Sequence, residues 1–439
     1  MNRLFRIGSL AALLFATAPG YGEDLLGIYD LARQNDPKLQ QAEASYQAEA
    51  EVKPQSRALL LPDFSFSANT TDNDQSRTYS IAQFSGSGTF NSHGYSFTLT
   101  QPIYHHDYFV QYRQAGVRVQ QSSEELTAAR QDLIVRVSQA YFNVLAAEDV
   151  LEFAQSERKA NEQQLEQTKQ QFKVGLIAIT DVNEAQASFD LSRAQEIQAK
   201  NQLANAREAL RVITGAYHDQ LQPLGEKVPL TIPAPADIEA WTTTALDKNP
   251  LLLASRHAAE VAQQQVNLLR AGHYPTVDLV VNSSDSVSGG GSLGSSEVND
   301  TSVALQLNLP IFQGGLVSSK TREAHDRFIQ AQQALEEQRR AAINQTRESY
   351  LGVTSNISLV NAYSQAIVSN NSRLEATKAG LEVGTRTTVD VLNARRDLFA
   401  AKRDYAQARY NYVLSILQLK QAAGTLTRQD LETINKWLQ

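Results

Sequence analysis

Few residues of this 439-residue chain have types and spacings that could support chemistry. Asp390 and Asn393 are three residues apart, so they share one face of any helix that carries them. His105, His106 and Asp107 are adjacent, but adjacent ligands without a further His or Cys cluster rarely form a metal site. The sequence contains no GxSxG, HExxH or Walker motif. We therefore expect a protein that is not an enzyme and that uses no metal and no cofactor.

The elements that would carry these residues occur twice in the chain. The segment from Val174 to Val182 recurs from Val383 to Val391, at an offset of 209 residues. Other repeated positions, at similar offsets, are Pro37 with Pro250, Pro62 with Pro275, Pro102 with Pro310, and Gly215 with Gly424. Each half has the same order of a helix, two strands joined by a loop, a very long helix, a break and a helix. Such a duplication predicts a pseudo-symmetric architecture.

The long helices are expected because proline is absent from long stretches. No proline lies between Pro102 and Pro223, and none follows Pro310. A single helix over residues 107–174 would extend roughly 100 Å at ~1.5 Å per residue. A seven-residue repeat also predicts paired coiled coils. Its large members are Val391, Leu398, Tyr405, Tyr412 and Leu419, and its small members are Ala394, Ala401, Ala408, Ser415 and Ala422; in the first half, Glu196 interrupts the equivalent large series.

Four short segments alternate apolar with small polar residues. We expect strands at about 63–71, 94–104, 276–284 and 301–312, with polar loops at 72–93 and 283–301. This alternation is typical of strands in a membrane barrel. A soluble sandwich with one solvated face would show the same alternation.

The number of strands predicts the number of copies if the strands are in a membrane. Four strands cannot close a barrel, because the smallest closed barrels use about eight. An open sheet edge is not tolerated in lipid. Two copies would give a barrel that side chains nearly fill, whereas three copies would supply twelve strands and leave a lumen. A chain that conducts therefore favours a trimer.

The N-terminus indicates export from the cytoplasm. Arg3 and Arg6 precede a short apolar stretch and small residues, so residues 1–22 are expected to be a signal peptide. A membrane anchor is the alternative, although the stretch is short for one. Removing both arginines changes the formal net charge from −7 to −9, which disfavours binding to nucleic acid. The chain has no cysteine, so packing must stabilise it without disulfides.

Several motifs together resemble those of a known family. They are Thr385-Arg-Thr-Thr-Val-Asp390-Val-Leu-Asn393-Ala, Ala408-Arg-Tyr-Asn-Tyr412, Ala423-Gly-Thr-Leu, Glu23 at the expected mature start, the Asn35-Asp36-Pro37 turn and Gln171-Phe-Lys-Val-Gly175. With these motifs, essentially the whole mature chain resembles the TolC family of outer-membrane efflux proteins. The resemblance implies a mixed α and membrane β fold: a trimeric, 12-stranded barrel in the outer membrane, continued by a 12-helix coiled-coil tunnel in the periplasm.

The resemblance also suggests how the chain is divided. Repeat 1 would occupy residues 23–214 and repeat 2 residues 236–424. A Pro-rich linker, residues 215–235, and a C-terminal segment, residues 425–439, would form a small equatorial domain around the tunnel.

Asp390 and Asn393 are the expected pore constriction. They follow the Gly384 break, and threefold symmetry would turn an inward Asp390 into a ring of three charges that attracts cations. The family carries acidic residues at both positions, so Asn393 should make this ring less charged. The resemblance also marks Gly175 and Gly384 as tips of helical hairpins, where glycine permits a tight turn and the close approach of a periplasmic adaptor.

The resemblance places an entrance latch beside this ring. Arg386 matches the latch arginine of the family, Asp181 and Thr180 match its partners on a neighbouring coil, and Gln164 matches a further polar partner. Leu381 replaces the latch tyrosine and cannot make its hydrogen bond. The alternative is that Asp181 and Asp390 only cap the helices that follow the breaks.

The function implied by the resemblance is a passive exit duct for efflux or type I secretion. The expected partners are two further copies of the chain, a periplasmic adaptor, an inner-membrane transporter and outer-membrane lipid. A structural envelope protein that bridges the outer membrane and the periplasm without conducting stays open as an alternative, and a periplasmic hydrolase is a remote one. The sequence does not name the exported substrates.

Overall fold

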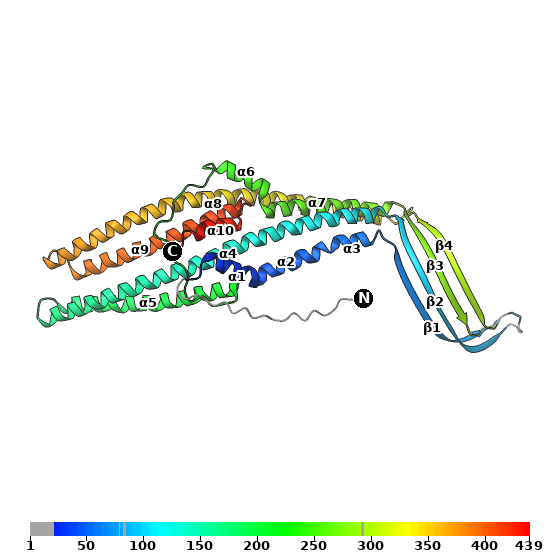
Figure 1. Ribbon diagram of the computed structural model, residues 1–439, viewed down its shortest axis with the longest axis horizontal. Helices are drawn as coiled ribbons and strands as arrows, with labels where there is room; N and C mark the ends of the chain where they lie inside the picture. The colour runs from blue at the N-terminus through cyan, green and yellow to red at the C-terminus, as the bar shows by residue number, and fades with distance from the viewer. Residues whose placement is uncertain (1–21, 79, 82–84, 291–293) are drawn as a thin grey trace.

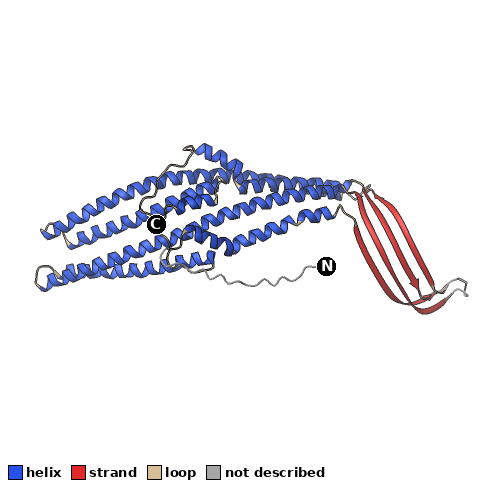
Figure 2. Cartoon of the chain, viewed as in Figure 1, coloured by secondary structure: helices blue, strands red, loops and turns tan. Residues whose placement is uncertain are grey.

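The computed structural model describes residues 22–78, 80–81, 85–290 and 294–439. Apart from Gly22, the expected signal peptide lies outside the described residues. The chain is elongated, with a β-sheet at one end and two helical hairpins that reach the opposite end (Figure 1). Figure 2 shows that strands and helices occupy separate parts of the molecule.

The order of the elements shows the duplication that the sequence predicts. In the first half they are α1 (Leu25–Asn35), α2 (Pro37–Ala50), α3 (Val52–Ala58), β1 (Asp63–Arg77), β2 (Gly86–Tyr104), α4 (His106–Lys173) and α5 (Ile179–Thr214). In the second half they are α6 (Ile238–Lys248), α7 (Pro250–Arg270), the 3₁₀ turn η2 (Ala271–His273), β3 (Thr276–Ser288), β4 (Ser296–Asn308), α8 (Leu316–Glu382), α9 (Thr388–Ala422) and α10 (Arg428–Asn435).

Equivalent caps begin the second helix of each half. Asp36 accepts a hydrogen bond from the backbone N–H of Leu39 at 3.0 Å, immediately before Pro37. Asn249 accepts one from Leu252 at 3.0 Å, immediately before Pro250. An Asp or Asn cap followed by proline at the first helical position is a strong start signal. The same combination of a capping side chain and a proline therefore explains why α2 and α7 begin where they do.

The four strands form one antiparallel sheet in the order β1-β2-β3-β4. Its strands are longer than the alternation predicts, because β1 continues to Arg77, β2 begins at Gly86, and β3 continues to Ser288. The expected loops 72–93 and 283–301 were therefore largely wrong, and β4 ends at Asn308 rather than at 312. The backbone ladder needs no apolar side chains, so polar segments pair as well.

The long helices form two hairpins that lie side by side. We call α4 with α5 the first hairpin, and α8 with α9 the second hairpin. Their longest members, α4 and α8, contain 68 and 67 residues, which corresponds to roughly 100 Å each. The seven-residue repeat of α9 is buried as expected: Val391, Leu398, Tyr412 and Leu419 are buried, and so are all five small members.

The main core lies where the helices cross the middle of the molecule. Tyr141 of α4 and Tyr412 of α9 are fully buried, and each ring packs in one hydrophobic cluster. Their hydroxyl groups donate to the chain that wraps the helices, Tyr141 to the carbonyl of Gln222 at 2.8 Å and Tyr412 to that of Pro229 at 2.9 Å. A buried tyrosine is stable there because its polar tip has a partner.

The segments 215–235 and 425–439 contact each other. Leu224 and Leu438 form an antiparallel bridge, and the Gly225 N–H donates to the Trp437 carbonyl at 2.8 Å. Leu431 and Ile434 of α10 bury their side chains in the main core. Both segments therefore pack at the middle of the helical part, between the sheet and the hairpin ends.

Candidate functional site: the hairpin tips and the sheet

Each hairpin ends in the same turn, and we call these turns the tips (residues 174–178 and 383–387). Gly175 and Gly384 have φ values of 71° and 75°. In the first tip, the N–H groups of Gly175 and Leu176 donate to Phe172 and Gln171, and in the second the Gly384 N–H donates to Leu381. This pattern is a Schellman motif, in which glycine takes the left-handed position that side chains disfavour.

The first tip presents apolar side chains to solvent. Val174 is 70% exposed and Leu176 is 73% exposed, and Val383 of the second tip is 75% exposed. A Cβ atom added at Gly175 or Gly384 would meet nothing within 4 Å. Both glycines are therefore required by their backbone conformation and not by the space around them.

Asp390 caps α9, as the alternative interpretation of the sequence stated. Its Oδ2 accepts from the Thr387 backbone N–H at 2.9 Å and from the Thr387 hydroxyl at 2.9 Å, while that hydroxyl accepts from the Asp390 N–H. These bonds from Thr387 lower the pKa of Asp390, and the nearby Arg386 charge adds to the effect. The carboxylate stays ionised, so capping leaves a negative charge at the start of α9.

The start of α5 is built similarly but more weakly. Asp181 accepts from the Ala178 backbone N–H at 3.3 Å. Ala178 has no side-chain oxygen to return the bond, so this cap is one-sided, whereas the cap at Thr387 is reciprocal. Asp181 and Asp390 thus occupy equivalent positions in the two hairpins.

Arg386 lies in the second tip against Gly380 of α8. A Cβ atom at Gly380 would lie 2.6 Å from the Arg386 Cγ. The missing side chain therefore makes room for the arginine. The sequence analysis missed Gly380, although a glycine six residues before Arg386, just ahead of the turn, could have indicated a close approach of the two residues.

The chain does not bring the expected latch residues together. Within the described residues, Arg386 and Asp181 form no ion pair, and they belong to different hairpins. Thr180 is exposed, and Gln164 is buried in α4 with its carbonyl bonded to Thr168. Leu381 is partly buried in the seam between α8 and α9, where it packs against the cluster of Leu374, Val391, Ala394 and Leu398.

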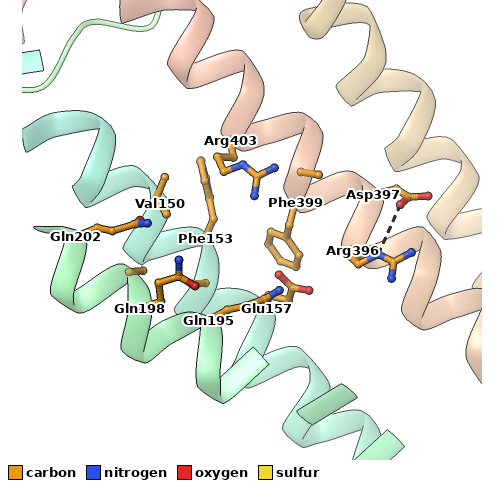
Figure 3. Close-up of a pocket in the computed structure, with 13 residues that line it drawn as sticks. Val150, Phe153, Glu157, Gln195, Gln198, Gln202, Arg396, Asp397, Phe399 and Arg403 are labelled. Atoms are coloured by element: carbon orange, nitrogen blue, oxygen red, sulfur yellow. Dashed lines mark ion pairs between the residues drawn. The ribbon is translucent and has the colours of Figure 1, made fainter. Parts of the chain in front are cut away.

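An open groove separates the two hairpins a few turns from the tips (Figure 3). It has a volume of about 490 Å³ and is lined by α4, α5 and α9. Phe153 and Phe399 supply apolar walls, and Glu157, Arg396 and Arg403 supply charges. Burial raises the pKa of Glu157, although the charges of Arg396 and Arg403 oppose the shift.

Glu196, which interrupts the repeat of α5, is paired rather than isolated. Its carboxylate contacts Arg158 of α4 at 2.5 Å and Lys200 of α5 at 2.7 Å. The hydrogen bond from Lys200 makes the largest contribution to lowering the pKa of Glu196, and the bond from Arg158 lowers it further. The interruption is thus an ion-pair link within the first hairpin.

The sheet carries one apolar face. Directly opposed pairs such as Phe66 with Phe97, and Val281 with Val303, place apolar side chains on that face. Phe66 is 58% exposed and Leu305 is 70% exposed. The opposite face carries polar contacts such as the Thr98 hydroxyl bond to Asn282 at 3.1 Å. Such an exposed apolar face needs a partner other than water.

His105 lies at the junction of the sheet and α4. Its Nε2 is 3.0 Å from a carboxylate oxygen of Asp278 on β3, and its ring stacks on Tyr108. The histidine therefore links the helical part to the sheet through one carboxylate.

Among the helices of the described residues, none is long and apolar enough to span a membrane.

A long helical part joined to a sheet that has an exposed apolar face and, among the described residues, two unpaired edges is the architecture of an outer-membrane channel. The family model for outer membrane efflux proteins matches residues 28–216 and 241–425. The chain belongs to this family, whose members are channels and not enzymes. It is an outer-membrane exit duct that extends into the periplasm.

Individual relatives resemble it over nearly all of their lengths. The outer membrane protein TolC of Vibrio cholerae is 38% identical, with 100% of this chain and 99% of the relative covered. The alkaline protease secretion protein AprF of Pseudomonas aeruginosa is 31% identical over 99% of this chain and 91% of its own. Among solved structures, the Campylobacter jejuni CmeC outer membrane channel has a TM-score of 0.81, with 18% identity, 100% of this chain and 98% of that chain covered.

Proposed function

We propose that three copies of the chain form one barrel of twelve strands and one tunnel of helices. The observation that carries this proposal is the sheet, whose edge strands β1 and β4 have no strand beside their outer edges among the described residues. In lipid, an unpaired edge leaves backbone N–H and C=O groups without hydrogen bonds. Pairing β1 of one copy with β4 of the next removes every edge, and three copies leave a lumen.

The lipid-facing side would be the apolar face of the sheet. Phe64, Phe66, Val303, Leu305 and Leu307 are all more than half exposed in the single chain. Polar residues on the other face would line the water-filled lumen. Residues 1–22 would be removed on export, and residues 215–235 and 425–439 would form the equatorial belt of the tunnel.

At the far end, the tips would form the periplasmic entrance. Because Arg386 and Asp181 do not meet within the chain, their latch would join neighbouring copies, with Thr180 and Gln164 as further polar partners. Leu381 faces the seam of its own hairpin and adds no hydrogen bond to the latch. Asp390, which stays ionised, would form a ring of three charges beside the partly exposed Asn393.

The partners follow from the class of protein. The chain has the architecture of a duct and no motif for nucleotide hydrolysis. An inner-membrane transporter would supply the energy, and a periplasmic adaptor would dock on Gly175, Gly384 and the exposed apolar tips. The similarity to AprF supports protein secretion as well as efflux.

The test is a pair of measurements on the purified mature chain. Cross-linking and mass measurement in detergent should give three copies, and planar bilayers should show single-channel conductance. A trimer that inserts without conducting would favour the structural envelope protein. A stable monomer that still inserts would refute the shared barrel.

A further inference from the structure

One side chain ties the two hairpins together near the tips. Arg395 of α9 donates from Nη1 to the carbonyl of Ala160 at 2.9 Å and to Asn161 Oδ1 at 3.4 Å, both on α4. Tyr410 of the second hairpin also bonds to Asp149 of the first, farther from the tips. Between that bond and the tips, Arg395 alone among the described residues makes hydrogen bonds from one hairpin to the other. Other polar contacts there, such as Arg158 with Glu196, stay within one hairpin.

The receiving end of this contact is a built site. Asn161 is 6% exposed, and its Nδ2 donates to the Ser188 carbonyl of α5 at 3.5 Å. Arg395 therefore reaches a residue that is itself fixed to the other helix of the first hairpin. One guanidinium thus connects α9 with both α4 and α5.

The electrostatic surroundings leave Arg395 dependent on this contact. Burial lowers the pKa of Arg395, and the charge of Glu157 opposes that shift only in part. No carboxylate of the described residues lies within ion-pairing distance of Arg395. A half-buried guanidinium that lost its acceptors would leave donors unsatisfied, which costs more than an ordinary hydrogen bond.

The space beside the contact is open. The groove of about 490 Å³ separates the same two hairpins, and its lining includes Glu157, one turn before Asn161, and Arg396, the neighbour of Arg395. Figure 3 shows Phe153 and Phe399 on opposite walls of this groove. Packing across the groove therefore leaves a gap, which the hydrogen bonds of Arg395 span at its tip side.

We propose that Arg395 is a closing contact of the duct entrance that acts within one chain, in addition to the Arg386 latch between copies. The inference rests on the proposed function, because a closing contact has meaning only where the tips surround an entrance. Arg395 lies two residues beyond Asn393, so separating α9 from α4 at this level widens the constriction. Opening must then break the bonds to Ala160 and Asn161, and Arg395 is a positioning residue.

The experiment compares three variants in planar bilayers, with trimer yield measured alongside. Arg395→Met removes the donors and keeps much of the apolar stem, so the open-to-closed ratio should rise roughly tenfold, about 1.4 kcal/mol. Asn161→Asp turns one acceptor into a carboxylate and replaces a bond between an ion and a neutral amide with an ion pair, so the ratio should fall by a similar factor. Arg193→Met is the matched control, because Arg193 is exposed on α5 outside the groove, and it should leave the ratio unchanged.

The outcomes separate the contact from the duct. If the wild-type trimer shows no conductance, the duct is refuted, and the closing role of Arg395 with it. If the wild type conducts and Arg395→Met matches it, the closing role alone is refuted. A shift in the same direction for Arg395→Met and Asn161→Asp would show a purely structural residue and would also refute the proposal. Should Arg395→Met yield no trimer, Asn161→Asp decides, and an unchanged ratio refutes the role.

Discussion

Replacing Asn393 by aspartate should make the entrance distinctly more cation-selective. Asn393 is partly exposed on α9 and lies three residues from Asp390, about one helical turn along the axis. We favour this change over Asp390→Ala because Asp390 caps α9 through Thr387, so its removal would also disturb the helix start. The substitution adds a charge and leaves the cap intact.

The magnitude follows from the charges that threefold symmetry would add. In a water-filled lumen, one unit charge about 8 Å from a cation contributes about 0.5 kcal/mol. Three new carboxylates would contribute about 1.5 kcal/mol, or roughly tenfold in local cation concentration. The bonds from Thr387 lower the pKa of Asp390, so its charge should survive beside a second carboxylate.

The assay is the reversal potential across a salt gradient, with titration of a multivalent cation as blocker. The shift should be large at low salt and small at 1 M salt, where the Debye length is ~3 Å. Asn205→Asp is the matched control, since Asn205 is exposed on α5 and far from the tip. An Asn393→Asp channel with wild-type selectivity at low salt would refute the ring, because Asn393 would then not face the lumen.

Three further changes test the entrance and the fold. Arg386→Ser should raise single-channel conductance, because it would remove the proposed ion pair with Asp181 of a neighbouring copy, worth on the order of 1 kcal/mol; unchanged conductance would exclude the latch. Replacing Gly175 and Gly384 by leucine should reduce export in cells while trimer yield and membrane insertion persist, and undiminished export would place docking elsewhere. Asp36→Asn should lower the thermal unfolding temperature at pH 7, because the buried Asp36 carboxylate lies 2.7 Å from the half-buried Arg136 guanidinium. Burial alone would raise the pKa of Asp36, but the hydrogen bond from Arg136 lowers it below its usual value. The stabilisation from this ion pair is therefore present above about pH 4 and is lost as pH falls through the folded pKa. The difference between the two proteins should therefore shrink at pH 3, and a constant difference would assign the loss to the helix cap alone.

Much of the helical fold was readable from the sequence because its signals are local. Helix ends are marked by Gly175 and Gly384, and helix starts are marked by the caps Asp36 and Asn249. Each of these signals acts on the neighbouring backbone. The seven-residue repeat of α9 predicted its buried seam for the same reason, since the period of a helix fixes which residues share a face. The apolar side of the sheet was equally readable from the alternation of period two.

Strand length was less readable. The segments 72–77 and 86–93 are polar or glycine-rich and were expected to be loops, yet Arg77 pairs with Gly86 and Asp72 with Asn91. Their pairing depends on the backbone ladder that the neighbouring apolar segments start. Side-chain patterns therefore predict where a strand meets an apolar environment better than they predict where it ends.

The sequence by itself determined the duplication, the helix boundaries, the apolar face of the sheet and, through its motifs, the family. Only the tertiary structure decided which charged groups meet: Glu196 pairs with Arg158, and Arg395 reaches Asn161 across 234 residues of sequence. It also decided that Arg386 and Asp181 stay apart within one chain, while Leu381 packs into its own hairpin. The physical reason is that caps and periodic faces are set by neighbours within a few residues, whereas a long side chain chooses its partner only after distant helices have packed.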